Sequence, residues 1–178
     1  MVTTPTDRHT DREAVYLRML NEHGGAVRRV ADSYERDPGR RQDLVQDIWM
    51  SIWQALPSFR GECAEKTFVF RIAHNRAVNH IAHWRLRRTE PLDEADPLDH
   101  HTPDPERAAT EREQRERLQA AVRALPLALR QTTVLMLEGL THREIAEVLG
   151  VSENTVAVRL TRARGALARA MALQGALG

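Results

Sequence analysis

A proline-rich acidic stretch divides this 178-residue chain and limits the folds open to it. The stretch from Thr89 to Glu106 carries seven carboxylates and four prolines, with no Lys or Arg and no apolar residues at helical spacing. Proline interrupts helices and like charges repel, so this composition predicts a flexible linker. We therefore expect two small domains, over residues 10–88 and 107–173, joined by an acidic linker over residues 89–106.

Both domains are expected to be helical. Aromatic residues make up only 4% of the chain and glycine occurs nine times, which disfavours a β-sandwich or barrel, whereas Ala, Leu, Arg and Glu are abundant and favour helices. The predicted fold class is therefore all-α. The single cysteine, Cys63, excludes an intramolecular disulfide and a zinc site built from several thiolates.

The sequence carries no signal for export or membrane insertion. Its N-terminus, MVTTPTDRHTDRE, lacks the apolar core of a signal peptide, and no apolar run approaches the length of a bilayer span. A cytoplasmic protein is therefore expected.

The net charge of +1 conceals an uneven distribution of charge along the chain, because Arg71 to Arg88 and Arg159 to Arg169 contain arginines and no acid. Arginine suits phosphates and guanine edges, although a GC-rich genome also explains an excess of arginine.

The first domain is predicted to contain three helices. The first, over residues 12–35, is expected to be interrupted or to end near Gly24 and Gly25, because glycine weakens helices. Pro38-Gly39 is expected to form the turn before the second helix. Apolar residues recur every four positions over residues 43–56, which predicts an amphipathic helix that a proline then ends.

The third helix carries residues suited to single-stranded nucleic acid. Thr67 can cap this helix. Polar side chains gather on about one turn of it: Asn75, Arg76, Asn79 and His80. Basic residues beside aromatic ones suit a strand whose bases are splayed and stacked. Local helix-end hydrogen bonding remains an alternative role for the two asparagines. Core packing is the favoured interpretation for three aromatic residues: Trp49, Trp53 and Phe68.

The second domain contains a predicted helix-turn-helix. It opens with helices over residues 106–125 and 127–138. Thr141 and Glu144 then have the spacing of a capping box, so a helix starts there. Gly150 stands where a left-handed turn is needed. The next helix can be capped by a serine and buries four residues at helical spacing: Val156, Leu160, Ala163 and Leu167.

The outward face of this last helix is expected to enter the major groove of DNA. Arg159 and Arg162 can reach guanine edges or phosphates, and Val158 can touch a thymine methyl group. Asn154 and Thr155 lie near the helix N-terminus, where the helix dipole favours phosphate. The alternative is a plain helical hairpin with solvated arginines, which agrees less well with the cap, glycine and core spacing.

The two domains together resemble an extracytoplasmic-function (ECF) type bacterial RNA polymerase sigma factor. DLVQDIWMSIWQAL is similar to the polymerase-binding helix of that family, and TFVFRIAHNRAVNHIAHWRLRR to its promoter-melting and −10 element segment. LPLALRQTTVLMLEGLTHREIAEVLGVSENTVAVRLTRARGAL is similar to its −35 element reader. The resemblance implies core RNA polymerase and promoter DNA as partners, an anti-sigma factor as a further partner, and no catalytic residue, metal or cofactor.

The resemblance also implies roles for particular residues. Core polymerase contacts are implied for Asp43, Leu44, Gln46 and Asp47. Contacts to the −10 element are implied for Ser58, Phe59, Arg60, Lys66, Asn75, Arg76, Asn79 and His80. Contacts to the −35 element are implied for Ser152, Asn154, Thr155, Ala157, Val158, Arg159 and Arg162. Asn79 departs from the aspartate usual in the family at that position, and this departure leaves the promoter sequence open.

Parts of the sequence also fit two other functions. LTHREIAEVLGVSENTVAVRL also resembles the helix-turn-helix of LuxR-type regulators, so the alternative function is a stand-alone LuxR-like transcriptional regulator. Such a regulator would usually carry a receiver or ligand domain upstream, and the first domain has no pattern of that kind. A metal-dependent enzyme is disfavoured, because only two of three histidines on the third helix, His74, His80 and His83, share a face.

Overall fold

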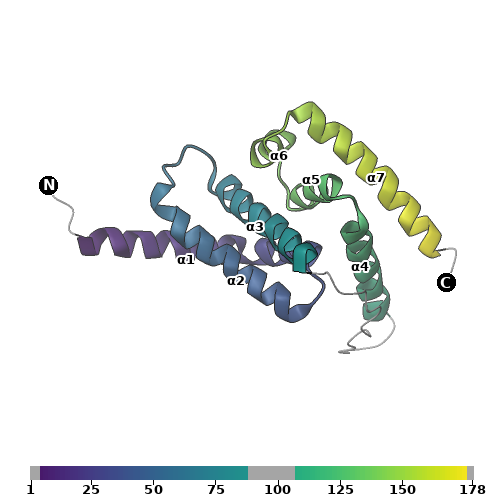
Figure 1. Cartoon of the computed structure of the whole chain (residues 1–178), viewed down its shortest axis with the longest axis horizontal. Coiled ribbons are helices and arrows are strands. Elements are labelled where there is room, and N and C mark those ends of the chain that lie inside the picture. The colour runs from purple at the N-terminus through teal and green to yellow at the C-terminus, as the bar shows by residue number, and fades with distance from the viewer. Residues whose placement is uncertain (1–4, 88–106, 176–178) are drawn as a thin grey trace.

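The computed structural model describes residues 5–87 and 107–175, so the predicted linker lies outside the described residues. Four elements form the first lobe: α1 (Pro5–Tyr34), α2 (Pro38–Ala55), the short 3-10 helix η1 (Leu56–Ser58) and α3 (Glu65–Arg87). Four helices form the second lobe: α4 (Arg107–Ala124), α5 (Leu127–Leu137), α6 (His142–Leu149) and α7 (Glu153–Gly175) (Figure 1). No strand occurs in these two ranges, which confirms the all-α prediction.

Helix α1 runs without interruption through Gly24 and Gly25, so the predicted break there was wrong. Two glycines cost a helix about 1 kcal/mol each relative to alanine. The buried stripe nevertheless continues in phase on both sides of them, from Met19 to Val27 and Val30. Packing of this stripe against α2 and α3 therefore outweighs the weak local propensity.

Helix α2 begins at Pro38, five residues before the predicted start. Asp37 is its N-cap, with the carboxylate oxygen Oδ1 accepting a hydrogen bond from the Arg40 N–H at 2.7 Å. Proline fits the first helical position because the amide it lacks would have had no partner there. Pro38-Gly39 therefore opens a helix here instead of forming the turn that the sequence suggested.

The first lobe packs α1, α2 and α3 against one another around buried aliphatic and aromatic side chains. Ile48 and Ile52 of α2 and Phe70 of α3 are fully buried, as expected for the apolar stripes of amphipathic helices. Trp49 is also buried, and Trp53 lies edge-on to the Tyr16 ring with their centroids 5.1 Å apart. The interpretation of both tryptophans as packing residues is confirmed.

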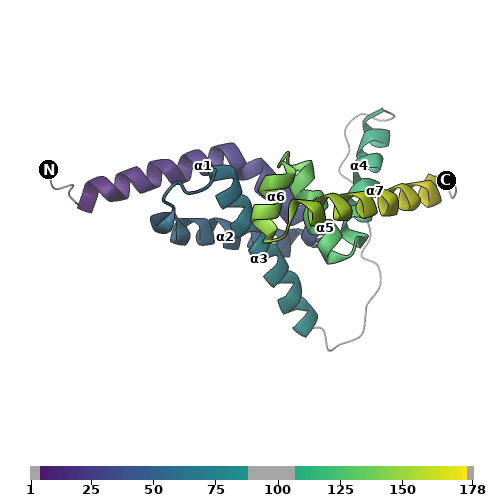
Figure 2. The ribbon, with the colours of Figure 1, turned by 90° about the horizontal axis from the view of Figure 1, so that it is seen from above.

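The second lobe lies directly against the first. Helix α6 contacts α3, while α1 contacts both α4 and α5, and the buried residues of the two lobes form one continuous cluster. Helix α7 lies on the outer side of the second lobe, away from the first (Figures 1 and 2). Among the described helices, none combines the length and hydropathy that a bilayer span requires.

Candidate nucleic-acid interface

The helix-turn-helix forms as the local signals indicated. Glu144 accepts a hydrogen bond from the Thr141 N–H at 2.7 Å, and the Thr141 hydroxyl accepts one from the Glu144 N–H at 3.3 Å. This is a complete capping box, and its hydrogen bonds lower the pKa of Glu144. Gly150 follows α6 with φ of 64°, which is the left-handed conformation that reverses the chain toward α7.

Gly150 gives a test of this turn. A Cβ at position 150 would meet no atom within 4 Å, so Gly150→Ala carries only the cost of the left-handed backbone. We expect a loss of about 1–2 kcal/mol in the free energy of unfolding, measured by chemical denaturation. Gly150→Asn is the matched control and should lose less, because asparagine tolerates this conformation. An alanine variant as stable as the wild type would contradict this account of the turn.

The predicted reading face of α7 lies at the surface of the second lobe. Val156, Leu160 and Ala163 turn inward and are buried. On the opposite side Asn154, Val158 and Arg162 are exposed. Three further residues of the predicted face are half-exposed: Thr155, Ala157 and Arg159. The residues implied for the −35 element therefore share one accessible side of the helix, which a flat or grooved partner can approach.

Ser152 acts at the start of α7 in the way that its position suggested. Its hydroxyl oxygen accepts a hydrogen bond from the Thr155 N–H at 3.2 Å, and the two hydroxyl oxygens are 2.9 Å apart. Ser152 therefore satisfies one of the backbone donors that a helix leaves free at its N-terminus. The remaining donors of this turn point toward the space in front of the helix, where the dipole favours an anion.

The loop between η1 and α3 holds the first group of residues implied for the −10 element. Ser58 donates a hydrogen bond from its hydroxyl to the Ala55 carbonyl at 2.6 Å. Phe59 is half-buried and packs on Phe68, with ring centroids 4.6 Å apart. Phe68 is thus a packing residue, as interpreted from the sequence. Arg60 is exposed, and Lys66 donates from Nζ to the Gly139 carbonyl of the second lobe at 2.9 Å.

Helix α3 holds the second group of residues implied for the −10 element. Asn75, Arg76 and Asn79 are exposed, whereas His80 is half-buried with Nε2 2.9 Å from the Glu35 carboxylate. Asn75 and Asn79 lie on one side of a cavity of about 300 Å³ between the lobes. Its lining is His74, Asn75, Val78, Asn79, Gln131, Val148 and Leu149. The amides of α3 therefore face the junction with the second lobe.

His74, a candidate metal ligand in the sequence, is a buried residue of the first lobe. It is 3% exposed, and its Nδ1 lies 3.3 Å from the Tyr34 hydroxyl oxygen. Burial lowers the pKa of His74 to about 4 and raises the pKa of Tyr34. His74 and His80 have separate partners, Tyr34 and Glu35, so these two histidines do not combine into one site.

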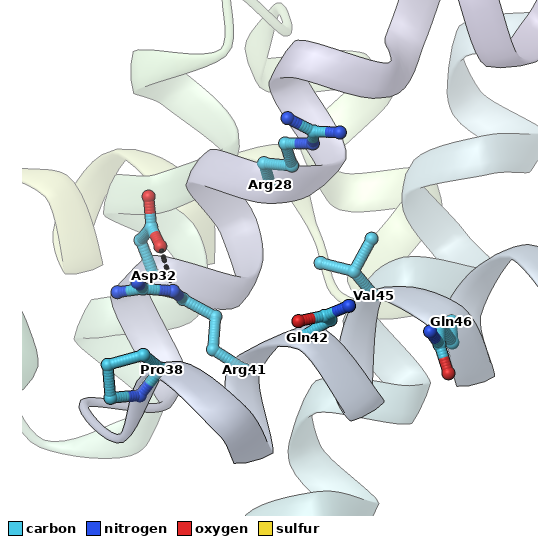
Figure 3. Close-up of a pocket in the computed structure, with 7 residues that line it drawn as sticks. All are labelled: Arg28, Asp32, Pro38, Arg41, Gln42, Val45 and Gln46. Atoms are coloured by element: carbon cyan, nitrogen blue, oxygen red, sulfur yellow. Dashed lines mark ion pairs between the residues drawn. The ribbon is translucent and has the colours of Figure 1, made fainter.

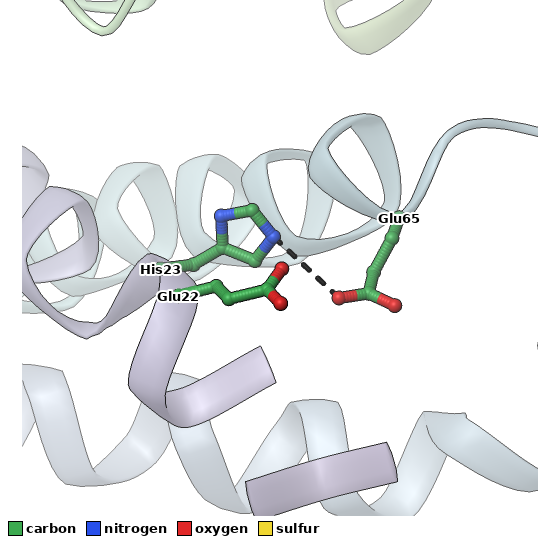
Figure 4. A group of neighbouring side chains, drawn as sticks. All are labelled: Glu22, His23 and Glu65. Atoms are coloured by element: carbon green, nitrogen blue, oxygen red, sulfur yellow. Dashed lines mark ion pairs between the residues drawn. The ribbon is translucent and has the colours of Figure 1, made fainter. Parts of the chain in front are cut away.

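One group of three metal-capable side chains occurs among the described residues, formed by Glu22, His23 and Glu65 (Figure 4). His23 Nε2 lies 3.6 Å from one carboxylate oxygen of Glu65, and Arg18 donates to the other at 2.6 Å. The Arg18 guanidinium already supplies a positive charge to this carboxylate. The Arg18–Glu65 ion pair therefore joins α1 to the start of α3.

The segment implied for polymerase binding lies on α2. Asp43, Gln46 and Asp47 are exposed and available to a partner. Leu44, by contrast, is 1% exposed and packs in the core, so its side chain supports the helix and offers no contact surface. A cavity of about 660 Å³ lies beside this segment, between α1 and α2 (Figure 3). It is lined by Arg28, Asp32, Pro38, Arg41, Gln42, Val45 and Gln46.

The lining of this cavity is mainly basic and amide-bearing. Arg41 turns toward Asp32 across it, with Nε 2.9 Å from a carboxylate oxygen (Figure 3). Arg28 is exposed on α1 and faces the same space. Gln42 and Gln46 present amides from α2, which can both donate and accept hydrogen bonds. The surface beside the exposed acids of α2 is therefore suited to polar contacts with another protein.

Comparison with known protein families gives two matches, one in each lobe. Residues 19–87 match sigma-70 region 2, and residues 115–167 match sigma-70 region 4. The chain is 35% identical to RNA polymerase sigma-H factor of Pseudomonas aeruginosa over 148 residues, which cover 78% of this chain and 76% of the relative. It is 29% identical to RNA polymerase sigma factor NccH of Alcaligenes xylosoxydans, over 84% of this chain and 82% of the relative.

Two solved structures share the arrangement of helices. CnrH in complex with the cytosolic domain of CnrY aligns with a TM-score of 0.68 at 23% identity, covering 90% of both chains. The sigma factor RpoE in complex with the anti-sigma factor NepR, from Bartonella quintana, aligns with a TM-score of 0.70 at 20% identity. That match covers 88% of this chain and 96% of RpoE.

Proposed function

Because this chain belongs to the extracytoplasmic-function sigma factors of the sigma-70 family, which direct RNA polymerase to promoters, we propose a division of promoter recognition between its two lobes. The domain over residues 10–88 binds the core enzyme and the melted −10 element. The domain over residues 107–173 reads the −35 element as duplex. The acidic segment over residues 89–106 links them. The single observation that carries this proposal is that one chain presents both an accessible α7 face in its second lobe and an exposed polar turn of α3 in its first.

The −35 element is read by the accessible side of α7. Arg159 and Arg162 reach guanine edges or phosphates, and Val158 contacts a thymine methyl group in the major groove. Asn154 and Thr155 contact the sugar-phosphate backbone of the DNA near the N-terminus of α7, where Ser152 caps the first turn. The small side chain of Ala157 lets the helix approach the DNA closely. This assignment is supported by the exposure of the face and by the buried opposite side of the helix.

Removal of these two arginines gives a direct test. Arg159→Ala and Arg162→Ala should each weaken promoter binding by the holoenzyme by about 1–3 kcal/mol, which corresponds to about fivefold to 150-fold. Arg169→Ala is the matched control, because it removes the same charge from an exposed position two turns further along α7. Competitive promoter binding and abortive transcription would measure the effect. Equal losses in all three variants would contradict a specific reading face.

The −10 element is bound by the η1–α3 loop and the exposed turn of α3. Arg60 and Lys66 supply cations for the phosphates, and the Phe59 ring lies close by for stacking. Asn75, Arg76 and Asn79 offer amides and a guanidinium to unpaired bases, and His80, held by Glu35, borders them. Ser58 orders the loop. Trapping unpaired bases repays the few kcal/mol lost in unpairing, so the bubble is stabilised without a catalytic residue.

The partners and location follow from this role. Asp43, Gln46 and Asp47 form the contact surface for core RNA polymerase, with Leu44 supporting the helix from inside. An anti-sigma factor is a further partner, supported by the likeness to RpoE, whose solved structure contains the anti-sigma factor NepR. The protein acts in the cytoplasm beside the polymerase, and the chemistry of RNA synthesis belongs to that enzyme.

Transcription in vitro tests the whole proposal. Purified protein added to core polymerase should start RNA synthesis at specific promoters of its own genome, and core polymerase alone should not. Tight, sequence-specific duplex binding in a gel shift without polymerase would instead favour the LuxR-like regulator. Failure to bind core polymerase in a pull-down, with any inhibitory protein removed, would overturn the assignment.

A further inference from the structure

One group of side chains in the first lobe has no part in the function proposed above. Glu22 and His23 are neighbours on α1, and Glu65 is the first residue of α3. Both residues of α1 point toward Glu65, and one ligand atom of each side chain lies within 4.8 Å of the others (Figure 4). We call these three residues the Glu22–His23–Glu65 group. It lies at the surface, because Glu22 is exposed and the other two are only partly buried.

The distance between His23 and Glu65 fits a shared metal ion better than a hydrogen bond. Nε2 of His23 lies 3.6 Å from Oε1 of Glu65. Hydrogen bonds between nitrogen and oxygen are usually about 2.7–3.2 Å long. Two ligand atoms of a tetrahedral zinc ion, each bonded at about 2.1 Å, lie about 3.4 Å apart. The observed separation therefore suits an imidazole and a carboxylate that hold one ion between them.

The oxygen of Glu65 that faces His23 is a buried acceptor without a hydrogen bond. Oε1 has no hydrogen-bond partner among residues 5–87 and 107–175, although buried polar atoms nearly always have one. The other oxygen, Oε2, accepts a hydrogen bond from the Arg18 guanidinium at 2.6 Å. Arg18 therefore holds the carboxylate through one oxygen and leaves the other directed toward His23. Carboxylates that bind metals are oriented by outer partners in the same way.

The donor atoms and the charge of the group favour a divalent transition metal. With an uncharged imidazole, the two carboxylates and the Arg18 guanidinium together carry one net negative charge, which a divalent cation offsets. One imidazole nitrogen and two carboxylates form a donor set that zinc accepts, whereas magnesium and calcium prefer oxygen ligands alone. Three protein ligands also leave one tetrahedral position for water, which the exposed side of the group admits.

We propose that the Glu22–His23–Glu65 group binds one zinc ion, which ties α1 to the start of α3. The ligands are Nε2 of His23, Oε1 of Glu65 and one carboxylate oxygen of Glu22. Bound zinc fixes the end of the η1–α3 loop, because Glu65 begins the helix that follows this loop. The site adds a function to the chain and does not depend on promoter recognition.

Isothermal titration calorimetry with zinc sulfate tests this site on the full chain. The protein carries Cys63→Ser, because a free thiol also binds zinc. We expect one zinc ion to bind per chain and the thermal unfolding midpoint to rise, since a ligand that binds only the folded state stabilises it. Absence of saturable binding, or an unchanged midpoint at saturating zinc, would overturn the proposal.

Substitution of the ligands locates the bound ion. His23→Gln removes the imidazole, and Glu65→Gln removes a carboxylate charge while keeping the shape of the side chain. Each should weaken zinc binding by at least about tenfold, because the loss of an outer partner alone costs about tenfold to a hundredfold. Glu22→Gln should also weaken binding, and this exposed position tests the site without disturbing the packing of α1 on α3. Unchanged affinity in these variants would refute the assigned ligands.

Matched controls separate this site from general binding of zinc to surface residues. His142→Gln on α6 and Glu13→Gln on α1 make the same chemical changes at exposed positions outside the group. Both should leave the affinity for zinc unchanged. A loss in His142→Gln as large as that in His23→Gln would show that exposed histidines bind zinc without a defined site, which would overturn the proposal.

Competition with magnesium tests whether the imidazole is a ligand. Magnesium prefers an octahedral shell of oxygen atoms, so an equal concentration of magnesium chloride should displace little zinc. Full displacement would show that the two carboxylates bind the cation without His23, and it would contradict the proposed ligand set. None of these measurements involves polymerase or a promoter, so their failure would leave the proposed function intact.

Discussion

Replacing Phe70 by alanine should lower the free energy of unfolding by about 3–5 kcal/mol. Phe70 lies on α3, is 1% exposed and is among the largest side chains that are fully buried. Its removal loses the transfer free energy of an aromatic ring and leaves a cavity that the three packed helices of the first lobe cannot fill without moving. Since small domains are stable by about 5–15 kcal/mol, this loss is a large share of the total.

Urea denaturation followed by circular dichroism would measure this loss, and two further variants make it specific. Phe70→Leu keeps most of the apolar volume and should lose less than the alanine variant. Leu17→Ala removes a large apolar side chain that is 53% exposed on α1, and it should change stability little. If Leu17→Ala cost as much as Phe70→Ala, the burial of Phe70 would not be the source of the effect.

Local signals in the sequence predicted the second lobe well, because its turns are decided by neighbouring residues. Thr141 and Glu144 form the expected capping box, and Gly150 adopts the expected positive φ. Ser152 caps α7 through its hydroxyl. Each of these interactions joins residues three or four positions apart, so the information needed to predict them is contiguous in the chain.

In the first lobe, local sequence signals fail to predict the helix boundaries, because packing between helices determines where these helices begin and end. Gly24 and Gly25 predict a break, but the stripe that keeps α1 continuous gains its stability from α2 and α3, which local propensity does not include. Pro38-Gly39 suggests a turn, whereas Asp37, one position earlier, caps a helix that begins at Pro38. Proline alone is compatible with both a turn and a helix start.

The contacts between the lobes had no signal in the sequence at all. Arg29 and Glu138 are 109 positions apart, and Arg71 and Glu147 are 76 apart. Arg29, Arg71 and Glu147 lie on helices and Glu138 caps the end of α5, and nothing in the sequence around any of them indicates a distant partner. Charge sorting along the chain shows that opposite charges are available, but only the packing of α6 on α3 decides which of them meet.

His74 should make the stability of the protein fall as the pH decreases from above 6.5 toward 4. Burial lowers the pKa of His74 to about 4 in the folded protein, whereas a histidine in the unfolded chain titrates near 6.5. Between these values the unfolded chain binds a proton that the folded chain does not, so acid favours unfolding. The stabilisation is complete above pH 6.5, and about 3 kcal/mol of it is lost near pH 4.

Carboxylates titrate in a similar pH range, so variants are compared to isolate the contribution of His74 to the pH dependence of stability. His74→Gln cannot take up the proton, so between pH 7.5 and 5 it should lose about 2 kcal/mol less than the wild type in urea denaturation. Tyr34→Phe removes the hydroxyl beside Nδ1 but leaves the histidine buried. Its pH dependence should match the wild type, because burial is the cause of the lowered pKa. A flattened profile in Tyr34→Phe would assign the effect to the hydrogen bond instead.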